Sequence, residues 1–104
     1  MSEAVRILLA ELEAELKRQS LWEAMPPSSD ALASTSPFCV DTLPFTQWLQ
    51  WIYIPRLRAI MDHGAILPTG SDIKPYAEEA FNAQHIENRR SLLELIEQLD
   101  WQMR

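Results

Sequence analysis

Residues with reactive side chains are few and widely spaced in this sequence. Cys39 is the single cysteine, so the chain can form neither an internal disulfide nor a cysteine-based metal cluster. His63 and His85 lie far apart, and neither has a metal ligand three or four residues further on. We therefore expect no metal site and no cofactor.

Catalytic motifs are also lacking. Glu78 beside Glu79, and Glu94 near Glu97, could act as an acid and a base only if burial separated their pKa values. Their spacing places them on the outer faces of helices, which favours solvated surfaces. Two glycines are too few for a phosphate-binding loop, and no nucleophile elbow is present. The sequence predicts a protein that is not an enzyme.

One group of side chains stands out, because it combines aromatic rings with an aspartate and two arginines in one loop and helix. On a helical wheel Trp51 falls beside polar positions, which predicts a partly exposed ring next to Arg58. An exposed tryptophan beside an arginine is typical of the centre of a protein interface. The candidate binding residues are Phe38, Asp41, Trp48, Trp51, Tyr53, Pro55, Arg56 and Arg58.

Two other interpretations of the same residues stay open. A small ligand could bind in a pocket with walls made by Phe38, Trp48 and Tyr53, oriented by Asp41 and Arg56. Alternatively, the rings are core residues covered by a capping loop. The leading prediction is a non-enzymatic interaction protein with a protein partner or a second copy of itself, and the ligand-binding module is the alternative.

The element that carries most of these residues is an unusually apolar predicted helix from Pro44 to His63. Proline suits a first helical turn, and Asp41 or Thr42 could cap it. Apolar residues cover most of its circumference, so we expect it to be central or to face a partner. Pro55 should kink or split it.

The remaining segments predict further helices and one long loop. Leucines at spacings of three and four indicate an amphipathic helix from Ser2 to about Gln19, and a similar pattern predicts a last helix from about Ile86 to Met103 with Asp100 facing outward. Pro75 opens a short helix with Asp72 or Lys74 as its cap. Residues 25–43 form a Pro- and Ser-rich ordered loop, with one helical turn near residues 29–33 and with Trp22, Phe38 and Val40 as anchors. The predicted fold is all-α, one domain over residues 1–104, a compact bundle of four or more helices around a central, proline-kinked helix.

The charge balance limits the classes of partner. Fifteen acidic and nine basic residues give a net charge of −6, and the basic residues are scattered. Direct nucleic-acid binding and docking on anionic lipid are both disfavoured, because each needs a basic face. No apolar run reaches the length of a membrane-spanning helix, and no secretory signal is evident, so we expect a cytoplasmic protein.

Several short motifs lie close together in the loop and the apolar helix. They are Ser36-Pro37-Phe38, Asp41-Thr42, Pro44, Trp48-Leu49-Gln50-Trp51 and Ile54-Pro55-Arg56. Together they resemble the YqcC-like family of small bacterial proteins of unknown function. The resemblance implies an all-helical bundle and, in related bacteria, a gene beside that of a tRNA pseudouridine synthase, which suggests an accessory role to that enzyme. It implies no catalytic residues.

Overall fold

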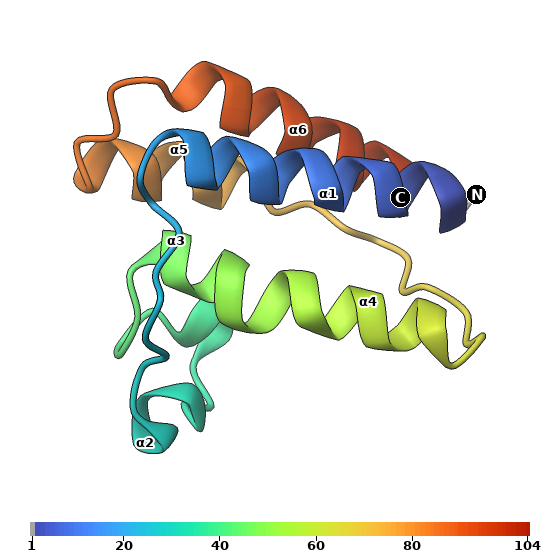
Figure 1. The fold of residues 1–104 in the computed structure, drawn as a ribbon, viewed down its shortest axis with the longest axis horizontal. Coiled ribbons are helices and arrows are strands. Elements are labelled where there is room, and N and C mark those ends of the chain that lie inside the picture. Colours follow the sequence, from blue (N-terminus) through green and yellow to red (C-terminus); the bar gives the residue numbers. More distant parts are fainter. Residues whose placement is uncertain (1) are drawn as a thin grey trace.

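The computed structural model describes residues 2–104, and within that range it contains helices and loops but no strand. The long helices α1 (Ser2–Arg18) and α6 (Arg89–Gln102) pack side by side in opposite directions, so that both ends of the chain lie at one end of the molecule (Figure 1). Beside them lie α5 (Lys74–Ala83) and a helical rod made of three consecutive segments. The predicted all-α class is confirmed.

The rod is the predicted apolar helix. It begins with α3 (Phe45–Trp48), continues through a π-helical turn, η2 (Leu49–Tyr53), and ends with α4 (Ile54–Asp62). Pro55 therefore sits in the first turn of α4, where its missing N–H is tolerated. The expected break in α-geometry is present as a π-turn just before the proline, whereas a kink angle at Pro55 stays a prediction.

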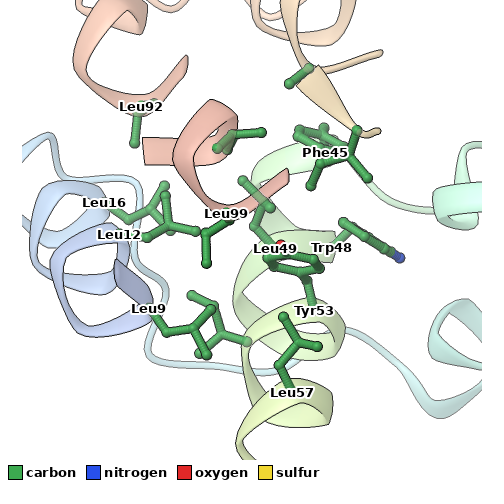
Figure 2. Close-up of a cluster of buried hydrophobic side chains, with 14 of the residues drawn as sticks. Leu9, Leu12, Leu16, Phe45, Trp48, Leu49, Tyr53, Leu57, Leu92 and Leu99 are labelled. Atoms are coloured by element: carbon green, nitrogen blue, oxygen red, sulfur yellow. The ribbon is translucent and has the colours of Figure 1, made fainter. Parts of the chain in front are cut away.

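The core lies between the rod and the α1–α6 pair. In Figure 2 the leucines of α1 and α6 point toward Leu49, Tyr53 and Leu57 on the rod. Each fully buried aliphatic side chain stabilises the fold by about 1.5–3 kcal/mol, so this contact fixes the rod against the helix pair. The largest fully buried side chains are Phe81, Leu9, Leu12, Leu16, Leu49, Ile54, Leu92, Ile96, Leu99 and Val5.

Three helices end in the same backbone motif. Ser20, Gly64 and His85 lie two positions past the last residues of α1, α4 and α5 and adopt positive φ angles of 61°, 69° and 58°. In each case the next residue donates its N–H to a carbonyl in the last helical turn, as Ile86 does to Phe81 at 3.0 Å. Because the backbone N–H of Ile86 is bonded to the end of α5, Ile86 belongs to that helix end, and α6 begins at Arg89 rather than at the predicted Ile86.

The prediction that Asp100 faces outward is wrong. The residue is buried, and its carboxylate accepts hydrogen bonds from the backbone N–H groups of Ile73 and Lys74 at 3.0 and 2.9 Å and from the Ser71 hydroxyl at 2.6 Å. The cap of α5 therefore comes from α6 and not from Asp72 or Lys74. The helical wheel could not reveal this, because a carboxylate is stable inside when it meets unpaired N–H groups at a helix start.

The segment 25–43 is tied to the rod through aromatic contacts. It contains a short helix, α2 (Ser29–Leu32), and a 3₁₀ turn, η1 (Pro37–Cys39). Phe38 meets Trp48 of the rod edge-on at 5.0 Å and stacks on Tyr76 of α5 at 4.4 Å between ring centroids, and Cys39 and Leu43 are the residues of this segment that are buried in the core. Val40 is 56% exposed, so its predicted role as an anchor is wrong.

Candidate interaction groove

A groove of about 490 Å³ lies between the loop that follows α1 and the outer side of the rod. The loop contributes one wall with Trp22, and the rod contributes the other with Trp51 and Pro55. The groove therefore joins two tryptophans that lie far apart in sequence. Its lining residues are Trp22, Glu23, Ala24, Gln50, Trp51, Ile54, Pro55 and Arg58.

A side chain from the π-turn holds the loop in place. Gln50 is buried, and its amide oxygen accepts from the Glu23 backbone N–H at 2.8 Å while its amide nitrogen donates to the Glu23 carbonyl at 2.7 Å. Gln47, one turn earlier, donates to the Glu23 carboxylate at 3.1 Å. Two backbone groups of the loop are thus satisfied by one side chain, which holds the residue after Trp22 against the rod.

The two tryptophans of the rod have different surroundings. Trp48 is buried and stacks on Phe45 with centroids 5.4 Å apart, and in Figure 2 its indole nitrogen points away from the leucines. Trp51 is half-buried in the groove wall, and its indole Nε1 is buried with no acceptor among residues 2–104. The rod therefore places one tryptophan in the core and the other at the groove.

Charged groups border the groove at the α1 side. Glu13 accepts from Lys17 at 2.8 Å through one carboxylate oxygen and from Arg58 at 2.7 Å through the other. The hydrogen bond from Lys17, opposed by partial burial and supported by Arg58, lowers the pKa of Glu13, which therefore stays ionised. The Lys17 ammonium also lies 5.2 Å from the centre of the Trp22 ring, a cation–π distance.

The remaining candidate residues do not surround a shared cavity. Phe38 meets Trp48 edge-on at 5.0 Å, and Trp48 lies 5.3 Å from Tyr53, so these rings fill one another's space. Burial raises the pKa of Tyr53 far above its usual range, with Asp100 adding to the effect. These three rings therefore pack against one another, whereas the ligand-binding alternative requires a pocket between them.

The two polar residues expected to orient a ligand lie elsewhere. Asp41 is exposed and accepts from the Ser34 hydroxyl at 2.5 Å, while Thr42 donates to the Ala31 carbonyl at 2.7 Å. Neither caps α3, whose start has no side-chain cap, so that expectation is wrong. Arg56 is exposed. Of Arg56 and Arg58, the latter is the one that forms an ion pair within the described residues, and its partner is Glu13.

Within 2–104 no group of three His, Cys, Asp or Glu side chains is placed to hold a metal ion. None of the helices described for these residues combines the length and apolarity needed to cross a bilayer.

Comparison with known proteins places the chain in a family. Residues 4–102 match the DUF446 family model, whose description reads "tRNA pseudouridine synthase C". YqcC of Escherichia coli is 38% identical over 96 residues, which cover 92% of this chain and 87% of YqcC. The chain belongs to the YqcC family of small bacterial proteins. The solution NMR structure of E. coli YqcC superposes with a TM-score of 0.83 at 35% identity and covers 96% of this chain and 85% of that one.

Two further relatives of the YqcC family carry different descriptions. An uncharacterised protein of Haemophilus influenzae is 42% identical over 72 residues, 69% of this chain and 68% of that protein. A tRNA pseudouridine synthase C of Pectobacterium carotovorum is 39% identical over 64 residues, 62% of this chain. The matched stretch is 17% of that synthase, so this chain resembles a small part of it.

Five of the groove's lining residues are not among the candidates predicted from the sequence: Trp22, Glu23, Ala24, Gln50 and Ile54. All five lie within the stretch that the DUF446 family model matches. The sequence predicts Trp22 only as an anchor of the loop, and Gln50 is named only as the polar residue of the apolar run Trp48-Leu49-Gln50-Trp51. A buried glutamine in such a run is itself a signal, because it must find a hydrogen-bond partner from another segment.

Proposed function

We propose that this protein is a non-catalytic accessory of a tRNA pseudouridine synthase, which it binds through the groove between Trp22 and Trp51. The groove is the observation that carries the proposal. It presents two half-buried tryptophans, a proline and an arginine, a composition enriched where protein partners bind most tightly.

The identity of the partner rests on the comparisons. A stretch similar to this chain forms 17% of a polypeptide named tRNA pseudouridine synthase C. A module carried on the same polypeptide as an enzyme acts at high effective concentration, whereas a separate chain needs a binding surface to stay associated. We infer that the groove is that surface, that residues 1–104 act as one domain, and that both partners work in the cytoplasm, where tRNA is modified.

Co-purification tests the proposal. The protein and the tRNA pseudouridine synthase of the same bacterium are mixed, and the mass of the complex they form is measured by size-exclusion chromatography with light scattering. We expect a stable complex that Trp51→Ala combined with Pro55→Ala weakens at least about tenfold, as loss of a central anchor does. Far-UV circular dichroism of the double variant shows whether the fold is kept.

Three outcomes would contradict the proposal. The first is the absence of a complex at micromolar concentrations. The second is a homodimer whose formation depends on the groove and excludes the synthase. The third is binding to tRNA alone with an affinity that falls steeply with salt, because that dependence marks phosphate contacts rather than a protein interface.

A further inference from the structure

The groove has different polar groups at its two ends. The Glu23 carboxylate stands near Gln47 and Gln50, and the Arg58 guanidinium stands at the far end of the apolar wall. At 1.5 Å per residue, Gln50 and Arg58 are about 12 Å apart along the rod. The site is therefore long enough for a short segment of chain and has a direction.

The Arg58 end has one carboxylate for two cations. Glu13 is the acceptor for both Lys17 and Arg58, so one positive charge is left without an anion of its own at that end. The Arg58 side chain is 39% exposed, and a guanidinium has five N–H donors, of which Nη1 provides the bond to Glu13. Donors therefore remain for a second carboxylate, which arginine binds in a two-pronged geometry.

The middle of the groove is apolar. It is lined by Trp22 from the loop and by Trp51, Ile54 and Pro55 from the rod. Gln50 is the polar side chain in this part of the groove, and its amide oxygen and amide nitrogen are both already hydrogen-bonded to the Glu23 backbone. The middle therefore suits an apolar side chain, which gains from burial and loses no hydrogen bond.

From this arrangement we propose that the groove binds a peptide segment of the synthase in which an apolar side chain seats between Trp22 and Trp51 and a neighbouring carboxylate pairs with Arg58. This inference rests on the proposed function, since the synthase is the partner. The carboxylates of Glu13 and Glu23 beside the groove favour a peptide with a single acidic group over the repeated phosphates of RNA or the surface of an anionic membrane.

Photo-cross-linking identifies the occupant. A photoreactive phenylalanine analogue replaces Trp51 in the full chain, and the full-length synthase of the same bacterium is the probe. We expect the captured synthase peptide to contain an Asp or Glu close to a large apolar residue. The matched control carries the analogue at Trp101, which is 64% exposed on α6 outside the groove, and should capture little.

Charge variants test the pairing separately. Arg58→Gln should weaken binding of the synthase about tenfold, and Arg58→Lys should recover most of the loss because it keeps the charge. Arg104→Gln is the matched control, since Arg104 is an exposed arginine 4.4 Å from the centre of the Trp101 ring and lies outside the groove. Its affinity should equal that of the wild type.

The results separate the two proposals. A wild-type chain that fails to bind the synthase contradicts the proposed function and this inference with it. A complex that forms normally but is insensitive to Arg58→Gln, cross-links equally from Trp101, or yields a captured peptide without an acidic residue contradicts the inference alone. Capture of RNA or of a second copy of this chain from position 51 does the same.

Discussion

Replacing Gln50 by alanine should loosen the loop that forms one wall of the groove. The side chain is 4% exposed and makes two hydrogen bonds to Glu23, at 2.8 and 2.7 Å. A hydrogen bond between neutral partners contributes about 0.5–1.5 kcal/mol net, so the pair contributes about 2 kcal/mol. For a domain of this size, that loss lowers Tm by about 8–16 °C.

The assay is urea unfolding followed by tryptophan fluorescence, combined with hydrogen exchange at the Glu23 amide. Gln50→Ala should lower the free energy of unfolding by about 2 kcal/mol and should also remove the protection of that amide, because its acceptor is gone. Gln47→Ala is the matched control. Its side chain reaches the same residue but bonds an exposed carboxylate, so we expect a loss below about 1 kcal/mol and an unchanged amide.

The reasoning fails in two cases. If Gln50→Ala is as stable as Gln47→Ala, the buried amide does not hold the loop. If the protein is destabilised while the Glu23 amide keeps its protection, the loss arises in the core and the loop is held by other contacts. In either case Trp22 would owe its position to something other than Gln50.

Three more predictions concern the fold. Asp100→Ala should lower the free energy of unfolding by about 3 kcal/mol in urea titrations, because it leaves two N–H groups at the start of α5 unpaired, whereas the exposed Glu97→Ala should cost less than about 1 kcal/mol. Ser20→Gly should raise Tm because it relieves a positive φ, and Gly64→Ala should lower it for the opposite reason; changes of the same sign would contradict this account. Hydrogen bonds from the side chains of Arg18, Gln19 and Ser91 lower the pKa of Glu15 from 4.5 to about 2. The ionised Glu15 carboxylate therefore stabilises the fold fully above about pH 4.5, and this contribution is lost as the pH falls toward 2. The stability difference between the wild type and Glu15→Gln, measured across that range, should shrink toward acid, and a constant difference would contradict the assignment.

The helices follow from the sequence because their apolar faces repeat with the helical period, and Pro44, Gly64 and Pro75 mark the two ends of the rod and the start of α5. It also predicted the half-buried Trp51 from the polar positions beside it on the wheel. It could not predict the Gln50 contact with Glu23 or the Asp100 cap of α5. Both are polar contacts between segments more than twenty residues apart, and no local pattern encodes such a pairing.

The aromatic residues show the same limit. Types and spacing alone cannot tell a ring that lines a pocket from one that packs in the core, because both positions favour the same side chains. Composition groups Phe38 and Trp48 with Trp51, whereas the structure places Trp48 in the core and Trp51 at the groove. What decides between them is which other segment lies opposite, and that follows only from the tertiary fold.

The π-turn from Leu49 to Tyr53 gives the rod a local tolerance to a change in length. A π-turn accommodates one residue more than an α-helix covering the same stretch, and such turns occur often at functional sites. Deleting one residue within the turn would therefore restore α-geometry and leave α3 and α4 in register. Deleting one residue at the start of α4, before Leu57, would instead rotate everything after it by about 100° relative to α3. Leu57 would then leave the core and Arg58 would turn away from Glu13, so the effect of a one-residue deletion depends on whether it falls in the π-turn or in the α-helix that follows.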